Sequence, residues 1–372
     1  MNSAGAIAVA EPMPEELSPR RLRRRLFELA LAVAVVALVV WLGPGLGSLR
    51  SHLAHASAGW IAAGVVFEVL STLSYVVIFR AVFCPRMRWQ LSYQIGMSEQ
   101  AANSVLSLSG AGGLALGVWA LRRGGMSTEH IGRRTVAFFV LTSLANVAAV
   151  IVFAGLYLVG ILHHDRNPAL TYAFGAAAVV ATALVVSLPA VVRAPAAGTV
   201  APGAGTVASP PSGRIAEALG FLRLSLRSGV RDAISLVRQR SLGVLSGSLG
   251  TTAFDLAVLG MAFRAFGASP AIGVLALGYL IGQLGGNIPI PGGIGGIDAG
   301  LIGTFVLYHQ PLAVTTAAVL IYHAIALWVP AILGSVAFVR LRSTLARETA
   351  PAAMCMPLAE PIEVVRASAL AG

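Results

Sequence analysis

Six long apolar stretches constrain the fold of this chain more than any other feature of its sequence. A helix that crosses the roughly 30 Å hydrocarbon core of a bilayer needs about 20 mostly apolar residues. Stretches of this kind cover residues 26–46, 59–79, 135–160, 169–192, 242–266 and 312–339. Only 11% of the residues are charged, whereas a soluble domain has about 25%. The sequence therefore predicts an all-α, polytopic membrane helix bundle with about six full spans.

Two further apolar regions are interrupted by helix-breaking residues. Region 90–121 contains SGAGG at 109–113, and region 270–308 contains NIPIPGGIGGIDAG at 287–300. Backbone groups released from a helix persist at membrane depth only where protein or a water-filled cavity satisfies them. We therefore expect two broken, re-entrant hairpins rather than two further simple spans.

The arginines indicate the topology. All 26 basic residues are arginine, and short loops rich in arginine mark the cytoplasmic side. With two re-entrant hairpins, Arg50, Arg166 and Arg264 lie outside and the remaining 23 lie inside. If region 90–121 crossed the membrane once, 12 arginines would already lie outside by residue 240. The split predicts a multi-pass protein of the plasma (cell) membrane with both termini in the cytoplasm.

A cleaved secretory signal peptide is the alternative interpretation of the N-terminus. The basic run RRLRRR at 20–25 precedes an apolar stretch, and AHASA at 54–58 offers small residues for cleavage. However, the apolar stretch is longer than a typical signal-peptide core, and the small residues lie well past its end. These two features favour a first span that is retained.

Composition divides the chain into segments. Residues 194–213 are rich in Pro, Gly and Ala and carry no charge, which is typical of a flexible linker. Residues 214–240 place apolar side chains at helical spacing beside a stripe formed by Arg223, Arg227, Arg231 and Arg238. This pattern is typical of an interfacial helix that is attracted to anionic lipid. The predicted organisation is a basic cytoplasmic N-terminus (1–25), a first membrane half (26–193), the linker (194–213), the amphipathic interfacial helix (214–240), a second membrane half (241–342) and a disordered cytoplasmic tail (343–372).

The two membrane halves repeat the same order of elements. Gly112 and Gly113 in the first half correspond to Gly292 and Gly293 in the second, and each double glycine interrupts a hairpin region between two long spans. Residues separated by the same number of positions as Gly112 and Gly292 are equivalent in the two halves, and this separation is termed the repeat offset. The first hairpin is expected to enter from inside and the second from outside, so the halves are predicted to form an inverted repeat. Inverted repeats with broken helices are the recurring architecture of secondary transporters.

The second glycine break carries a family resemblance. PIPGGIGGIDAG at 289–300, with the Tyr-His pair and the Trp-x-Pro that follow, resembles the transmembrane, flippase-like domain of the lysylphosphatidylglycerol synthases. The matching positions are Pro289, Pro291, Gly292, Gly293, Gly295, Asp298, Tyr322, His323, Trp328 and Pro330. Segment 103–127 resembles the first-half motif of that family more loosely. Asp298, His323 and Ser109 stand where the family usually has Glu, Arg and Pro.

The resemblance implies a stand-alone, flippase-like protein. In the synthases, the soluble aminoacyl transferase domain makes the lipid and the membrane domain is implicated in moving it between leaflets. The segment after Arg342, at 343–372, is too short for a catalytic fold, so we expect no enzyme activity. We expect translocation of a membrane lipid with an anionic or lipid-linked head group. The alternatives are a non-transporting membrane partner that anchors or regulates a lipid-modifying enzyme or glycosyltransferase, and a membrane-embedded transferase acting on lipid.

Polar residues at membrane depth are the candidates for a substrate cavity. Glu99 and Asn103 stand four residues apart and share a helical face, as do Gln283 and Asn287. Because each pair precedes the glycine break of its half, the pairs are predicted to face one cavity. Interhelical hydrogen bonding without a substrate is the structural alternative.

Four further ionisable residues complete the set of candidates. Glu68 and Asp255 lie mid-span in the helices before the two breaks, where an ionised carboxylate costs roughly 3 kcal/mol or more unless it is paired or hydrated. A half-helix that begins near Gly295 would present N–H groups to a phosphate. Asp298 would oppose an anion there unless it is protonated or paired, for instance by His323, so this pair is predicted to respond to protons or to bind a head group. Alternatively, Asp298 only caps the half-helix and His323 only packs.

No motif predicts a cofactor, a metal site or a nucleic-acid site. The short HHD at 163–165 is weak evidence for a metal ion, and no phosphate-binding or dinucleotide motif has its required context. The net charge of +11 follows the cytoplasmic face of the membrane. Cys84 and Cys355 lack metal-ligand spacing and are expected to be free thiols.

Overall fold

The computed structural model describes residues 47–106, 111–161, 214–285 and 296–347, together with single residues between 24 and 42 and between 172 and 187. These residues form α-helices and their turns, and none of them lies in a β-strand. The predicted all-α class is therefore confirmed for the described part of the chain.

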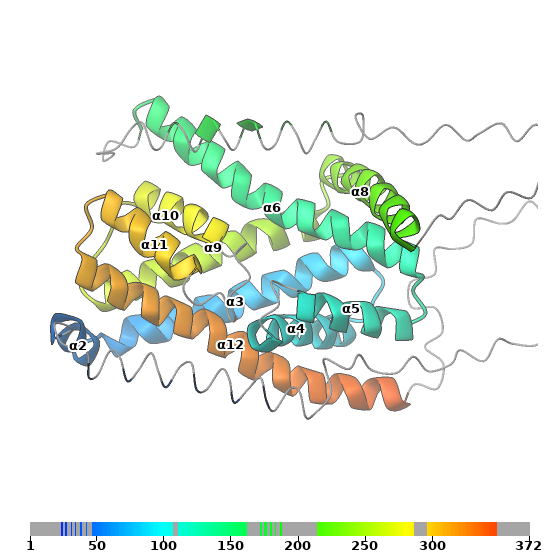
Figure 1. The fold of residues 1–372 in the computed structure, drawn as a ribbon, viewed down its shortest axis with the longest axis horizontal. Coiled ribbons are helices and arrows are strands. Elements are labelled where there is room, and N and C mark those ends of the chain that lie inside the picture. The colour runs from blue at the N-terminus through cyan, green and yellow to red at the C-terminus, as the bar shows by residue number, and fades with distance from the viewer. Residues whose placement is uncertain are drawn as a thin grey trace, which may run out of the picture.

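Four helices are long and apolar enough to cross a membrane: α3 (Ala58–Phe83), α6 (Thr128–Leu158), α9 (Leu242–Ala265) and α12 (Leu312–Arg347). They run along the long axis of the molecule (Figure 1). Four of the six predicted spans are thus present as helices. The other two, at 26–46 and 169–192, lie outside the described residues apart from single helical positions.

Two predicted boundaries shift. α6 begins before the predicted span, at Thr128, where the Ser127 hydroxyl accepts a hydrogen bond from the backbone N–H of His130 at 3.3 Å and caps the helix. α12 continues through Arg347, beyond the predicted end of the second half at 342, because no glycine or proline interrupts it there. The linker 194–213 and the tail beyond 347 lie outside the described residues.

The centre of the bundle is the antiparallel pair of α3 and α9, the two long helices that precede the broken regions. A side chain on Gly247 would place its Cβ only 2.7 Å from the backbone nitrogen of Ile78. Small residues allow this close approach of backbones, which is how helices associate in lipid without a hydrophobic driving force. Ile78 and Phe79 are completely buried beside this crossing.

Each broken region forms two short helices, as predicted. The first consists of α4 (Trp89–Leu106) and α5 (Ala111–Arg123), and the second consists of α10 (Ile272–Gly285) and α11 (Gly296–Leu307). Figure 1 shows the two pairs at opposite ends of the bundle. Their neighbours are exchanged, because α4 packs on α12 whereas α10 packs on α6.

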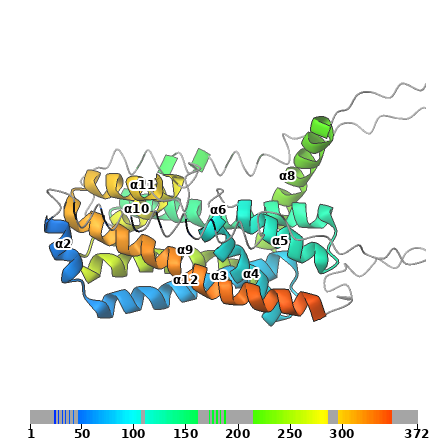
Figure 2. The same cartoon turned by 60° about the horizontal axis from the view of Figure 1, so that its bottom comes forward.

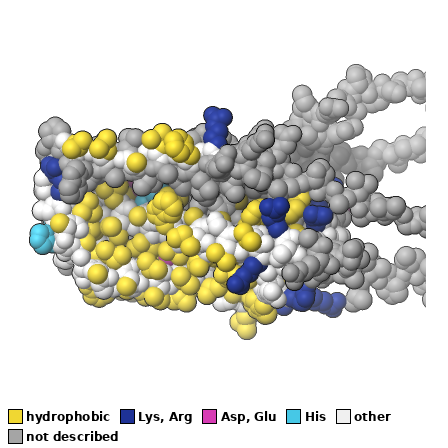
Figure 3. All heavy atoms as spheres, turned by 90° about the horizontal axis from the view of Figure 1, so that it is seen from below, with side chains coloured by type: hydrophobic (Ala, Val, Ile, Leu, Met, Phe, Trp, Pro, Cys, Tyr) yellow, Lys and Arg dark blue, Asp and Glu magenta, His cyan; other side chains and the backbone are white. Residues whose placement is uncertain are grey.

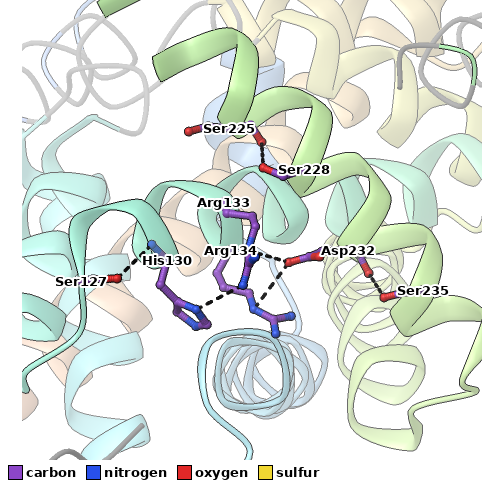
Figure 4. Close-up of polar contacts among 8 residues, drawn as sticks. All are labelled: Ser127, His130, Arg133, Arg134, Ser225, Ser228, Asp232 and Ser235. Carbon is purple, nitrogen blue, oxygen red and sulfur yellow. Dashed lines mark hydrogen bonds and ion pairs between the residues drawn. The ribbon is translucent and has the colours of Figure 1, made fainter. Parts of the chain in front are cut away.

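The amphipathic segment after the linker forms α8 (Arg214–Arg238), which extends away from the bundle in Figure 2. Its contact is with α6: Asp232 lies 3.0 Å from the Nε of Arg133 and 3.8 Å from that of Arg134 (Figure 4). Val230 of α8 is buried. Part of the apolar face predicted to rest on lipid is therefore used for packing on protein.

The outer surface fits a membrane environment. Figure 3 shows a face covered largely by hydrophobic side chains, with most of its arginines toward one end. This end, termed the arginine end, contains the ends of α3, α5, α6 and α12 and the turn between α3 and α4. It carries Arg80, Arg86, Arg88, Arg122, Arg123, Arg133, Arg134, Arg340 and Arg342. Arg50 and Arg264 lie at the opposite end. This distribution agrees with the arginine split in the sequence.

One expectation about cysteine is wrong. Cys84, which follows the last residue of α3, is disulfide-bonded rather than free. The only other cysteine in the sequence, Cys355, lies outside the described residues.

Candidate functional site

A cavity of about 410 Å³ lies between the long helices, the first broken region and α10 of the second, within the range of small-molecule sites. Its polar lining consists of Glu68, Ser71, Tyr75, Glu99, Gln100, Asn103, Ser104, Thr135, Thr142, Asn146, Thr251, Thr252, Asp255, Tyr279 and Gln283. Its apolar lining consists of Phe83, Leu114, Phe138, Phe139, Ala326 and Pro330. Among these lining residues three are acidic and none is Arg, Lys or His. The cavity is therefore polar and acidic inside an apolar bundle.

Asp255 of α9 is the most fully hydrogen-bonded acid of the cavity. Its Oδ1 accepts a hydrogen bond from the Ser71 hydroxyl of α3, and its Oδ2 accepts one from the Tyr279 hydroxyl of α10 at 2.9 Å. Hydrogen bonds to a buried carboxylate offset the loss of its hydration. Asp255 thus joins three helices across the repeat, which explains how a carboxylate is tolerated there.

Glu99 of α4 makes the matching contact in the other half. Its Oε2 accepts a hydrogen bond from the Tyr75 hydroxyl of α3 at 3.0 Å. The repeat offset that separates the double glycines also separates Tyr75 from Asp255 and Glu99 from Tyr279. Each half therefore has a tyrosine–carboxylate hydrogen bond between the same two positions of the repeat. In the first half the tyrosine comes first along the chain, and in the second half the acid comes first.

Glycine makes room for the Glu99 carboxylate. A side chain on Gly117 of α5 would place its Cβ 1.5 Å from Oε1 of Glu99. A side chain at this position would require the Glu99 carboxylate to move, so α5 lies directly against this carboxylate.

Glu68 of α3 differs from the other two acids. Its side chain is buried, with 5% of the residue exposed, and its Oε2 has no hydrogen-bond partner within the described segments. Asp255 is close enough to interact with it electrostatically. Two like charges in a buried site repel each other strongly, so Glu68 is the least compensated of the three acids.

The predicted pair Glu99 and Asn103 does lie on one side of the cavity, but Asn103 also has a structural role. Its Oδ1 accepts a hydrogen bond from the backbone N–H of Gly113 at 2.8 Å. Gly113 lies in the first turn of α5, where N–H groups lack partners within the helix. A Cβ on Gly113 would lie 2.5 Å from the backbone oxygen of Glu99. The first double glycine thus lets a half-helix approach α4 closely and receive a cap from it.

Asp298 and His323 are brought together as predicted. Asp298 lies in the first turn of α11, and its Oδ1 is 3.0 Å from Nδ1 of His323 on α12. Neighbouring Tyr322 is hydrogen-bonded to the Gln283 side chain and interacts electrostatically with Asp298. The pair therefore connects the second half-helix to the polar network.

The place of this pair in a substrate cavity stays a prediction, because neither residue belongs to the lining of the cavity described here. Tyr322, next to His323 in the chain, interacts electrostatically with both Asp298 and Asp255. Of the remaining predicted site residues, Asn287, Pro289, Pro291, Gly292, Gly293 and Gly295 lie outside the described residues.

Several lining residues were not singled out from the sequence. Ser71, Tyr75 and Tyr279 complete the carboxylate contacts. A signal for the two tyrosines was present, since the repeat offset maps Tyr75 onto Asp255 and Glu99 onto Tyr279. No comparable signal marks Ser71, because serine is common in apolar helices.

We expect the Asp298 and His323 substitutions to be non-additive. Asp298→Asn and His323→Gln should each lower the thermal stability of the detergent-solubilised protein, and the double variant should be more stable than the sum of the single losses predicts. The reason is that one partner alone is left uncompensated at a site that is mostly buried. The coupling should be about 0.5–3 kcal/mol. Additive losses would leave Asp298 as a capping residue only.

Comparison with known proteins gives one finding. The family model described as "Lysylphosphatidylglycerol synthase TM region" matches residues 29–334. No curated protein and no solved structure matches the chain.

Proposed function

The chain belongs to the lysylphosphatidylglycerol synthase TM region family, and from this premise we propose that it translocates a lipid or lipid-linked head group between the leaflets of the plasma membrane. The observation that carries the proposal is the acidic, polar cavity among membrane-spanning helices. A head group must leave water to cross the apolar layer, so its path needs polar partners. We propose transport rather than catalysis as the role of the cavity.

The rim of the cavity supports a lipid as the cargo. Leu114 of α5 and Phe139 of α6 line the cavity and are 38% and 51% exposed, and Asn103 beside them is also exposed. An apolar, exposed rim beside a polar interior suits a molecule whose head group enters while its acyl chains stay in the membrane. A soluble solute would need no such side entrance.

Three observations support an inverted repeat as the mechanical basis of transport. The short helix pairs α4–α5 and α10–α11 lie at opposite ends of the bundle (Figure 1). The long helix that packs on the first short helix of each pair is exchanged, since α4 packs on α12 and α10 packs on α6. The two tyrosine–carboxylate bonds occupy the same positions, related by the repeat offset. Two equivalent halves can exchange conformations and so open a central site to each side in turn.

The two ends of the molecule differ in the way that alternating access requires. At the arginine end, Phe83, Thr135 and Phe139 line the cavity. Their counterparts one repeat offset later, at the opposite end, are Phe263, Thr315 and Val319, and each is 0% exposed. At the arginine end Phe139 is 51% exposed and Thr135 is partly exposed, whereas Phe83 is buried although it borders the cavity. The contrast of Phe139 and Thr135 with Val319 and Thr315 supports a state with its site open toward the arginine end.

Leaflet-specific labelling tests the proposal. Purified protein would be reconstituted into vesicles that contain phosphatidylglycerol with a fluorescent acyl chain, and dithionite added outside would bleach the outer leaflet. We expect bleaching to proceed past the outer-leaflet share only in vesicles that contain the protein. Bleaching that stops at this share for several fluorescent lipids would favour the alternative of a non-transporting partner of a lipid-modifying enzyme.

The orientation is a separate prediction. In a background with both native cysteines replaced by serine, we expect Gly203→Cys to resist a membrane-impermeant maleimide in intact cells and Ser51→Cys near Arg50 to react. The physical reason is the retention of arginine-rich loops in the cytoplasm. Labelling at position 203 from outside would reverse the orientation and would instead agree with the disulfide at Cys84, since disulfides persist in oxidising compartments.

A further inference from the structure

Building on the proposed function, we propose that Glu68 and Asp255 together form a binding site for one exchangeable proton, and that occupation of this site couples lipid exchange to a proton gradient. The proposal rests on the place of both carboxyl groups in one cavity, on the unpartnered oxygen of Glu68 and on the chemistry of the surrounding helices.

The two carboxyl groups have unequal surroundings. Both oxygens of Asp255 accept hydrogen bonds, from Ser71 and from Tyr279, and such donors favour the ionised form. Oε2 of Glu68 has no partner within the described segments, although Glu68 lines the cavity and is buried. An uncompensated carboxylate at this depth is costly. A proton on Glu68 removes that cost and also removes the repulsion between the two acids.

No cation from the packed helices replaces the proton. The titratable groups around the pair are Glu99 of α4, Tyr75 of α3, Tyr279 of α10 and Tyr322 of α12, with Asn146 as the polar residue from α6. Asp298 of α11 also interacts with Tyr322, and the cation-forming side chain of His323 is paired with Asp298. The described surroundings therefore offer acids and hydroxyls but no free positive charge.

The exchange step itself is a simple proton transfer. The Glu68 carboxyl group gives its proton to water in the cavity and becomes a carboxylate, and the reverse step neutralises it. While the site is unprotonated, two carboxylates oppose the phosphate of an entering lipid. Once it is protonated, one of these charges is gone, so the head group and the proton enter together and leave together when the cavity opens to the other side.

Infrared titration tests the proton site without any transport. Wild-type protein in vesicles would be titrated from about pH 5 to about pH 9, the range that buried carboxyl groups reach, while the carboxylic C=O signal is recorded. In a Glu99→Gln background, which removes the third acid of the cavity, we expect one titrating carboxylic group that disappears in Glu68→Gln and titrates differently in Asp255→Asn. The matched control Glu129→Gln, at an exposed position in the first turn of α6, should keep it. An unchanged signal in Glu68→Gln overturns the proposal, as does an identical titration in Asp255→Asn and in the protein with Asp255 intact.

A gradient experiment tests the coupling. With the fluorescent phosphatidylglycerol described above, a gradient of one pH unit across the vesicle should shift the distribution of the probe between leaflets by up to about tenfold if one proton moves with each lipid. Glu68→Gln should abolish the shift, whereas Glu129→Gln should retain it. A shift driven by sodium but not by protons overturns the proposal, as does equal lipid transfer with and without the gradient. If the wild type moves no lipid at all, the proposed function fails, and the infrared titration still decides whether the proton site exists.

Discussion

Gly334→Leu should prevent stable folding of this protein. Gly334 lies on α12 where the helix crosses α4, and a Cβ at this position would be 2.1 Å from the backbone oxygen of Met97. A backbone atom cannot rotate away as a side chain can, so the two helices must separate. Their contact includes the buried residues Met97 and Ala337. Overpacking of a core usually costs about 1–3 kcal/mol, and we expect a loss at or above the upper end of that range.

The measurement is the fraction of monodisperse protein after solubilisation, together with the thermal midpoint of whatever remains. Gly155→Leu is the matched control, since Gly155 also lies within a long helix but has no atom within 4 Å of its ideal Cβ. It should be neutral or slightly stabilising, because glycine in a helix interior costs about 0.5–1 kcal/mol relative to alanine. Equal stability of the two leucine variants would contradict the close crossing of α4 and α12.

Phe263→Ala and Phe83→Ala should shift the protein in opposite directions between its two access states. Phe263 is completely buried at the closed end, and its ring centroid lies 4.7 Å from that of Phe305 on α11. Its counterpart Phe83, one repeat offset earlier, lines the cavity at the open end. Truncating Phe263 therefore costs this state most. Phe83 is also buried here, with its ring centroid 4.8 Å from that of Phe79, but it borders the cavity, so we expect its truncation to cost more in the state that closes the arginine end. A buried Phe→Ala change costs about 3–5 kcal/mol. If half of this cost depends on the state, the population shifts by about tenfold or more.

Reporter cysteines measure the shift. Thr135 lines the cavity and its counterpart Thr315 is 0% exposed, so single cysteines at these positions in a cysteine-free background report the two ends. With Phe263→Ala we expect faster maleimide labelling at position 315 and slower labelling at position 135, and the reverse with Phe83→Ala. The same direction of change in both variants would contradict two exchangeable halves, even if the protein transports lipid by another route.

Much of the architecture could be predicted from the sequence, because a bilayer imposes simple length and charge rules. Spans of about 20 apolar residues, glycine breaks and arginine-rich loops follow directly from the thickness of the membrane and its asymmetry. The separation of Gly112 from Gly292 sets the register of the two halves. In this register Tyr75 is equivalent to Asp255, and Glu99 is equivalent to Tyr279. The contact between Asp298 and His323 was predicted because an unpaired, ionised Asp298 would oppose a phosphate at the N-terminus of the half-helix.

The packing of the helices was decided only by the tertiary structure. A helix that is apolar on every side has no preferred face in its sequence, so nothing in α3 or α9 shows that Ser71 meets Asp255 across 184 residues of chain. The packing of α8 on α6 through Asp232 depends on the same undetermined rotations. The sequence also does not indicate the conformational state. The two halves have the same pattern of spans and breaks, although one end of the cavity is open and the other is closed. Only the positions of the atoms distinguish Thr135 at the cavity from Thr315 in the core.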